Sequence, residues 1–340
     1  MNNTKQFFIG IDVSKLTFDA AMIMVENHQK GSILTARFEN TAPGLKAFAK
    51  WLKANGLTTP ASALVVMENT GFYHRRLWLF CEKHNIPVHI GNAAQIKWSL
   101  GIIRGKDDTT DSIRLCKYAC KQGDELKNTP ALNTDVVRLK DLQTSRTRLI
   151  KQLTSNRVYL GELKGVSDPL IYGAMEKAYK AAIEGLEKSI AVIEEQIKSI
   201  VAKDASLKQN YKLLISVPGI GHVTAIYLLC CTANFAAKPT GKQLACYAGV
   251  APFGYSSGTS IRGRAKVHKM ANKELKRLLY MGARAAVQHN VEMKAYYERK
   301  KGEGKHDLTV INAVKNKIIL RVAAVIARQR PFVRKAAIAA

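Results

Sequence analysis

The order of short apolar segments in the first third of the chain most constrains its fold. Strands are predicted at residues 7–13, 17–25, 32–38, 63–67 and 87–90. Helices are predicted after Pro43 and at residues 73–84, 93–100 and 108–121. The first three strands are separated by short polar turns, whereas the later strands alternate with helices. This order predicts an antiparallel meander followed by parallel strand–helix units, which is an α/β domain.

The remainder of the chain has helical periodicity. Residues 133–160 form a long polar helical segment, and apolar residues then recur at heptad spacing from Tyr179 to Ile200. This stripe predicts either a helical hairpin or an intermolecular coiled coil. Residues 213–225 predict a helix, a tight turn and a second helix, and residues 272–289 predict a basic helix. We expect three domains, at residues 1–130 (α/β), 131–205 (long helices) and 206–340 (mainly helical).

The charge of the chain predicts a polyanionic partner. There are 53 Lys and Arg residues against 26 Asp and Glu, a net charge of +27. Residues 257–340 hold 20 of the basic residues and five of the acidic ones, so over half of the excess lies in a quarter of the chain. Such asymmetry favours nucleic acid, because each neutralised phosphate releases a condensed counterion. A membrane surface is disfavoured, since the basic stretches lack bulky aromatic faces.

The composition also excludes several classes of protein. Hydrophobic residues make up 47% of the chain, too many for a disordered basic protein. No apolar run is long enough to span a membrane, and the start does not look like a secretion signal, so we expect a cytoplasmic protein. The six cysteines contain no Cys-x-x-Cys pair, and buried thiols in a reducing compartment are the expected state.

Four acidic residues are candidates for a metal site. Asp12 lies at the end of the first strand and Glu68 at the end of the fourth, while Asp108 and Asp111 lie one turn apart at the start of a helix. If the two strands are parallel neighbours, both carboxylates emerge at the same edge of the sheet. Carboxylate oxygens without His or Cys favour Mg²⁺ or Mn²⁺, and two such ions can clamp the oxygens of a phosphodiester.

Each acid also has a structural interpretation. Asp108 could cap its helix, Asp12 could close a turn with Ser14, and Glu68 could pair with Arg75. These explanations are plausible one at a time, but the ordered set of four is harder to explain in this way.

The sequence resembles a known family, the DEDD recombinases of bacterial insertion sequences, which are guided by a bridge RNA, and the related pilin-gene invertases. The resemblance covers nearly the whole chain. It is carried by Gly10-Ile-Asp12, Met67-Glu-Asn-Thr-Gly71, the Lys-x-Asp-x-x-Asp block at residues 106–111, Pro218-Gly-Ile-Gly221, Ala248-Gly-Val-Ala-Pro252 and residues 255–263.

The resemblance implies an RNase H-like (RuvC-like) first domain, a central coiled coil and a helical transposase domain with a nucleophilic serine. That serine maps onto Ser257, which would attack a phosphodiester and hold the cut strand as a phosphoserine. Residue 256 is Ser where the family pattern suggests an acid, so Ser256 and Ser260 remain rival nucleophiles. Asp107 beside Asp108 leaves the ligand in that pair open. The alternative for this Gly/Ser-rich segment is a flexible loop that touches phosphate without chemistry.

Basic residues around and after this segment are candidates for nucleic-acid contact without sequence readout. They are Arg262, Arg264, Lys266, Lys269, Lys273, Lys276 and Arg277. Gly219 and Gly221 could expose a helix N-terminus to phosphate, as in a helix-hairpin-helix, or could simply form a packed helical turn. A solvated basic face is the alternative for the charged set.

We therefore predict a Mg²⁺-dependent or Mn²⁺-dependent DNA recombinase that moves an insertion sequence. Double-stranded DNA, a structured guide RNA and a homo-oligomer of dimers forming a tetramer are the expected partners, the last two implied by the resemblance. Three alternatives remain: an RNA-independent invertase of the same family, an actin-like or sugar-kinase-like ATPase, and a nucleic-acid-binding scaffold without turnover.

Overall fold

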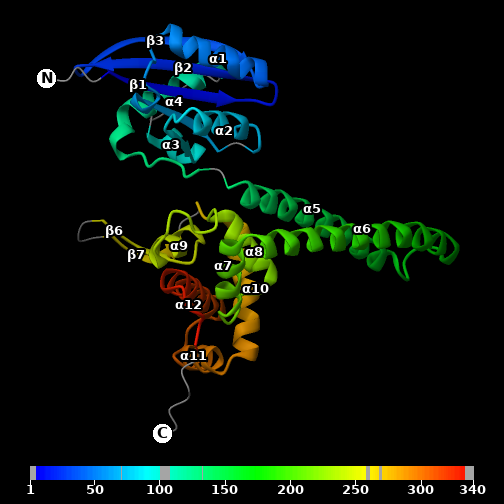
Figure 1. The fold of residues 1–340 in the computed structure, drawn as a ribbon. Helices are drawn as coiled ribbons and strands as arrows, with labels where there is room; N and C mark the ends of the chain where they lie inside the picture. The colour runs from blue at the N-terminus through cyan, green and yellow to red at the C-terminus, as the bar shows by residue number, and fades with distance from the viewer. Residues whose placement is uncertain are drawn as a thin grey trace. The chain divides into compact units, whose positions relative to one another are not determined.

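The computed structural model describes residues 5–69, 71–99, 108–131, 133–257, 261–267 and 270–333 (Figure 1). The chain divides into two compact units, Met1–Leu132 and Asn133–Ala340. The predicted α/β domain followed by mainly helical regions is confirmed. No helix in the described ranges is both long and apolar enough to cross a membrane.

The first unit is built on a five-stranded mixed sheet. Its strands are β1 (Lys5–Val13), β2 (Thr17–Glu26), β3 (Gln29–Glu39), β4 (Ala63–Glu68) and β5 (Val88–Gly91). They are ordered β3-β2-β1-β4-β5, with β1, β2 and β3 antiparallel and with β4 parallel to both β1 and β5. The predicted meander and the parallel pairing of the first and fourth strands are therefore confirmed.

Helices cover both faces of this sheet. They are α1 (Ala42–Ala54), α2 (Arg75–Lys83), α3 (Ala93–Ser99) and α4 (Asp108–Gln122). On one face, Ile9 and Ile11 of β1 belong to a core with Phe48 of α1 and Leu77 of α2. On the other face, smaller apolar clusters join the sheet to α3 and α4. Because side chains alternate along a strand, β1 turns Phe8, Gly10 and Asp12 toward α4.

Helix α4 lies against β1 at a distance that only glycine permits. A Cβ atom on Gly10 would lie 2.0 Å from the backbone nitrogen of Cys116 and 2.3 Å from the carbonyl oxygen of Ser112. The thiol of Cys116 also donates a hydrogen bond to the carbonyl oxygen of Phe8, at 3.2 Å. The absence of a side chain at Gly10 thus sets the distance between β1 and α4.

Most of the second unit is helical. The long helices α5 (Thr134–Leu163) and α6 (Pro169–Lys203) form an antiparallel hairpin (Figure 1). Arg146 of α5 pairs with Glu194 of α6 at 2.7 Å, and Tyr159 packs on Tyr179 with their ring centroids 5.5 Å apart. The heptad stripe therefore packs within one chain as a hairpin, and an intermolecular coiled coil stays a prediction.

The base of this hairpin shares a core with the C-terminal helices. These are α7 (Ala205–Ile215), α8 (His222–Cys231), α9 (Gly241–Tyr247), α10 (Lys273–His289), α11 (Val291–Gly302) and α12 (Asp307–Arg328). Leu139 of α5 and Ile197 of α6 belong to the same apolar cluster as residues of α7, α8, α10 and α12. The structure thus groups these long helices with the C-terminal helices, and the separate domain at 131–205 stays a prediction.

The Gly/Ser-rich segment between α9 and α10 contains regular structure, whereas the alternative interpretation was a flexible loop. It forms two antiparallel strands, β6 (Pro252–Ser257) and β7 (Ile261–Val267). Glycine and serine lower strand propensity, which is why the composition alone suggested a loop. Backbone pairing between the two strands outweighs that preference.

The cysteines are free, and their burial differs from one to another. Cys81 and Cys116 are buried as expected, whereas Cys246 is exposed, so the expectation of uniformly buried thiols is wrong there. Burial raises the pKa of the Cys81 thiol to about 12, which keeps it protonated and unreactive at neutral pH.

Replacing Gly10 by alanine should destabilise the first unit by at least ~3 kcal/mol, because the new methyl group overlaps backbone atoms that cannot move independently of α4. Urea unfolding followed by tryptophan fluorescence measures this, since all three tryptophans lie in the first unit. Gly185→Ala is the control: it lies in α6 with no atom within 4 Å of the added Cβ, and the tryptophan transition should not move. An unchanged transition for Gly10→Ala would contradict the close contact.

Candidate active site

Three acidic residues lie on the α4 face of the sheet near the same edge. Alternation along β1, β2 and β4 places Asp12, Asp19 and Glu68 on the face opposite the large apolar core that holds Ile11, Phe18 and Met67. Asp12 and Asp19 are direct partners across the β1–β2 ladder. The parallel register of β1 and β4 ends at Ile11 and Met67, so Asp12 and Glu68 are the next residues on two adjacent strands.

Asp111 of α4 approaches this edge from the helix side. The pKa of the Glu68 carboxyl is raised from its ordinary value, first by burial and second by the negative charge of Asp111. A bound cation would stabilise the ionised form of Glu68, which the neighbouring negative charge disfavours. Asp111 also accepts a hydrogen bond from Arg114 one turn along the helix, at 2.5 Å.

These carboxylates fit a divalent cation by their chemistry. Asp108 is the first residue of α4, one turn before Asp111, while Asp107 lies outside the described residues. Among the described side chains, which do not include that of Asp108, no group of three or more His, Cys, Asp or Glu could hold a metal ion. The donor set consists of carboxylate oxygens, the ligands that Mg²⁺ and Mn²⁺ prefer.

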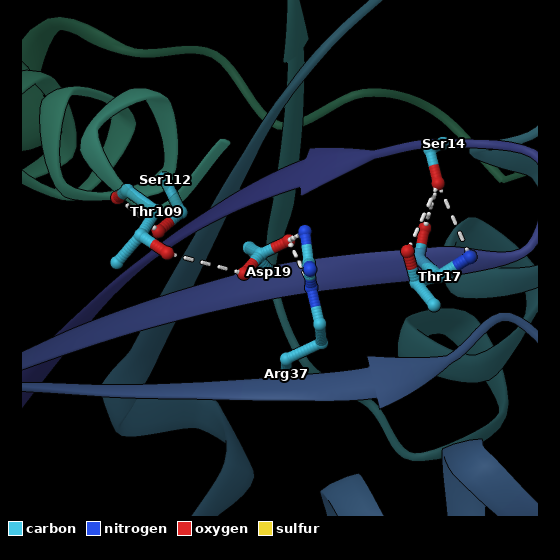
Figure 2. Close-up of polar contacts among 6 residues, drawn as sticks. All are labelled: Ser14, Thr17, Asp19, Arg37, Thr109 and Ser112. Carbon is cyan, nitrogen blue, oxygen red and sulfur yellow. Dashed lines mark hydrogen bonds and ion pairs between the residues drawn. The ribbon is translucent and has the colours of Figure 1, made fainter. Parts of the chain in front are cut away.

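The turn after β1 is held by hydrogen bonds between two of its own residues. The turn after β1 is closed by Ser14 and Thr17, whose backbone and hydroxyl groups exchange hydrogen bonds of 2.8 to 3.1 Å (Figure 2). None of the described basic side chains forms an ion pair with Glu68. Pairing of Glu68 with Arg75 is therefore not observed.

Asp19 is a residue at this edge that the sequence reasoning missed. Its side chain is 8% exposed and accepts hydrogen bonds from Nε and Nη2 of Arg37 on β3, at 3.0 and 2.9 Å (Figure 2). Its second oxygen lies 3.4 Å from the hydroxyl of Thr109, in the first turn of α4 between Asp108 and Asp111. Asp19 thus ties the acidic turn of α4 to the sheet. An acid in the middle of the apolar segment 17–25 was the available signal.

The second unit presents the candidate serine on a β-hairpin. Ser257 is the last residue of β6 and is paired with Ile261, while Ser256 is paired with Arg262 of β7. Arg264 and Lys266 also belong to β7. Ser260 and Lys269 lie outside the described residues.

The remaining candidate nucleic-acid residues lie on α10 and at the α7–α8 turn. Lys273 is exposed and Lys276 half-buried, whereas Arg277 is engaged by Glu274 at 2.7 Å. Gly219 has a φ of +91°, and a Cβ there would lie 2.7 Å from the Ile318 side chain, so packing accounts for it. Gly221 is exposed at the N-terminus of α8 with nothing within 4 Å of an added Cβ.

Asn272 anchors the base of the β6–β7 hairpin and was also missed. Its amide nitrogen donates to the hydroxyl of Tyr247 at 2.8 Å, and its side-chain oxygen accepts from Tyr227 and from the backbone of Leu275 at 2.9 Å each. Asn272 therefore joins α8, α9 and α10 where the chain leaves and re-enters the helical core around the hairpin.

Replacing Glu68 by glutamine should stabilise the metal-free protein at pH 7. The pKa of Glu68 is higher in the folded protein than its ordinary value of 4.5. Its carboxyl group therefore adds to the free energy of unfolding below pH 4.5, and this contribution is lost as the pH rises through the folded-state pKa. Removing the charge should raise the unfolding midpoint in EDTA by roughly 1–3 °C, as expected of a partly exposed like-charge contact. Mg²⁺ should then raise the midpoint of the unmodified protein more than that of Glu68→Gln.

The control for this experiment is Glu125→Gln, an exposed acid of the same unit, which should leave both midpoints unchanged. Equal responses of Glu68→Gln and the unmodified protein to EDTA and Mg²⁺ would contradict a shared cation.

Comparison with solved structures finds a distant likeness. The chain is similar to T. thermophilus RuvC in complex with Holliday junction substrate, with 10% identity and a TM-score of 0.27, over 36% of this chain and 99% of that chain. A similarity this low does not by itself establish a common activity.

Relatives identified by sequence cover more of the chain. The pilin gene-inverting protein of Moraxella bovis is 28% identical over 335 residues, covering 96% of this chain and 97% of that protein. An insertion element IS110 protein of Streptomyces coelicolor, described as an uncharacterized 43.6 kDa protein, is 32% identical over 40% of this chain and 34% of its own length. A probable family 20 transposase of Pseudomonas aeruginosa is 25% identical over 54% of this chain and 60% of its own.

Two family models match successive parts of the chain. The model of the DEDD transposase of IS110 matches residues 9–163, which include Asp12, Glu68, Asp108 and Asp111. The model described as Transposase IS116/IS110/IS902 family matches residues 211–298, which include the β6–β7 hairpin. Since both domains are present and together match most of the chain, the protein belongs to the IS110/IS116/IS902 family of DEDD transposases, enzymes that recombine DNA.

Proposed function

We propose that this transposase excises and integrates an insertion sequence with Ser257 as its nucleophile and a divalent cation at Asp12, Glu68, Asp108 and Asp111. The observation that carries the proposal is the parallel register of β1 and β4, which places Asp12 and Glu68 at the same edge, where the charge of Asp111 raises the pKa of Glu68. Carboxylates gathered at one sheet edge are a suitable ligand set for Mg²⁺ or Mn²⁺. When bound, the cation supplies positive charge to a phosphate.

The chemistry assigned to the serine is transesterification. The Ser257 hydroxyl oxygen forms a bond to phosphorus, the bond from phosphorus to one strand's oxygen breaks, and the serine proton ends on the departing hydroxyl. A hydroxyl of the recipient strand then attacks the phosphoserine and restores the serine. Bond energy is conserved across the two steps, so no nucleotide cofactor is required.

The basic residues are assigned to backbone contact. Arg262, Arg264, Lys266 and Lys269 belong to the segment around the hairpin, and Lys273, Lys276 and Arg277 continue along α10. Gly221 offers the open N-terminus of α8 to a phosphate, whereas Gly219 serves the packing of the same turn. Contacts of this kind position nucleic acid and carry no sequence information.

Selection of the target is assigned to a guide RNA. The net charge of +27 fits a polyanionic partner, and the family resemblance implies a bridge RNA. Base pairing would then supply sequence recognition that backbone contacts lack. We further propose assembly of dimers into a tetramer, with the α5–α6 hairpin as the element that joins subunits.

An RNA-independent DNA invertase is the second candidate. It is favoured by the pilin gene-inverting relative, which matches this chain over 97% of its own length. The two candidates share the DNA chemistry and differ in the guide. The comparisons give no support to an actin-like or sugar-kinase-like ATPase.

Replacing Ser257 by alanine, or Asp12 by asparagine, should lower strand exchange between plasmid-borne element ends by at least ~10³-fold, because each change removes a group that acts on the reacting phosphate. Sequencing of recombined junctions in cells measures this. Asp124→Asn, an exposed acid of the first unit, is the control and should retain exchange. Loss of exchange in Ser256→Ala or Ser260→Ala, with Ser257→Ala active, would assign the nucleophile elsewhere.

A discrete RNA encoded by the element should copurify with the protein from cells that carry the whole element. Sequencing the bound RNA tests this, and the same purification after replacing the element's non-coding flanks is the control. RNA that matches no single locus, together with normal exchange, would favour the invertase candidate.

A further inference from the structure

Asn40 is a buried side chain that joins two loops at the edge of the sheet in the first unit. It lies between β3 and α1, and only 3% of its surface is exposed. Its side-chain nitrogen donates two hydrogen bonds of 3.1 Å each, to the carbonyl oxygens of Ser14 and Tyr73. Ser14 belongs to the turn after β1, and Tyr73 belongs to the loop between β4 and α2. One amide group therefore connects two segments that are distant in the sequence.

The backbone of Asn40 makes the same connection a second time. Its N–H group donates to the carbonyl oxygen of Leu16, in the turn after β1, at 2.7 Å. Its carbonyl oxygen accepts a hydrogen bond from Nη1 of Arg76, in the first turn of α2. Asn40 thus makes two hydrogen bonds to the turn after β1 and two to the segment that leads into α2. These four bonds are called the Asn40 link below.

The two linked segments continue the strands that carry Asp12 and Glu68. The parallel pairing of β1 with β4 ends at Ile11 and Met67, so both acids lie just beyond the paired residues. From this point the ladder no longer sets the separation of the two strands. The Asn40 link lies beyond the end of the ladder, on the side of the two acids. Because a buried, hydrogen-bonded group restricts the segments that it joins, the link limits the movement of Asp12 relative to Glu68.

We propose that Asn40 is a positioning residue for the cation site, which holds Asp12 and Glu68 at the separation that a shared divalent cation requires. The inference rests on the proposed function, since it names a residue that supports two proposed ligands. Asn40 acts through the two loops, because its side-chain nitrogen is a donor and is used by two carbonyl oxygens. A merely structural role would lower stability and leave the cation affinity of the folded protein unchanged.

The test is Mn²⁺ binding to the full-length protein, measured by electron paramagnetic resonance well below the unfolding midpoint. Asn40→Ala removes both side-chain bonds and should weaken Mn²⁺ binding by about 10-fold to 100-fold, the range for residues that orient metal ligands. Asn40→Leu keeps much of the side-chain volume and should give the same loss. Agreement between the two variants separates the lost hydrogen bonds from the effect of a cavity.

Asn55→Ala is the matched control. Asn55 is half-buried at the C-terminus of α1, and its side-chain nitrogen donates to the carbonyl oxygen of Trp51 at 2.8 Å. Its replacement also removes a bond to a backbone carbonyl of the first unit, so it should lower the unfolding midpoint and leave Mn²⁺ binding unchanged. If folded Asn40→Ala binds Mn²⁺ as tightly as the unmodified protein does, the inference is overturned.

A second measurement needs no variant and decides the question if both Asn40 variants fail to fold. If the Asn40 link supports cation binding, a bound cation must in return stabilise the link. Mn²⁺ should therefore slow hydrogen exchange at the backbone amide of Asn40, which is bonded to Leu16. The amide of Asn55, which is bonded to Trp51, should exchange at the same rate with and without Mn²⁺. An unchanged rate at Asn40 would contradict the coupling.

Asp12→Asn distinguishes failure of this inference from failure of the proposed function. Since Asp12 is a proposed ligand, its replacement should weaken Mn²⁺ binding at least as much as Asn40→Ala does. If Asp12→Asn binds Mn²⁺ like the unmodified protein, the proposed cation site is wrong and the inference fails with it. If Asp12→Asn loses Mn²⁺ binding while both Asn40 variants keep it, the role assigned to Asn40 alone is wrong.

Discussion

The contact between Gly10 and the backbone of α4 is the constraint on which the candidate active site depends. With no side chain at this position, the helix lies against β1 at Cys116 and Ser112. This contact places the first turn of α4 near the edge where β1 and β4 end. There the negative charge of Asp111 contributes to the raised pKa of the Glu68 carboxyl. Asp19, held by Arg37, secures the same turn through Thr109. A backbone contact therefore positions the charged groups.

In the second unit, hydrogen bonds at the base of the β6–β7 hairpin hold a segment with low strand propensity in place. Glycine and serine give β6 and β7 little intrinsic strand propensity. Asn272 compensates at the base by bonding to Tyr227 and Tyr247, and Asn312 fixes the entry to β6. The proposed nucleophile, Ser257, depends on this frame, because it is the last residue of β6. Ser257 thus lies on the β6–β7 hairpin, while the helical core of the second unit holds the base of that hairpin.

The predicted order of strands and helices proved accurate where periodicity was strong. The apolar segments at residues 17–25 and 63–67 were predicted from local sequence patterns alone. The β6–β7 hairpin was missed because its stability comes from pairing between strands and not from composition. Asp19 and Asn272 were missed because their roles appear only through partners distant in the sequence, such as Arg37 and Tyr227.

The sequence by itself determined the class of the chain: an α/β domain, long helices, a large basic excess and acids at the ends of predicted strands. Those features are local, since they follow from residue type, spacing and charge. Only the tertiary structure decided that α4 contacts β1 through Gly10, that the heptad stripe closes within one chain, and that Asp19 lies beside Thr109 of α4. These depend on distances between segments far apart in the chain, which local propensities do not encode.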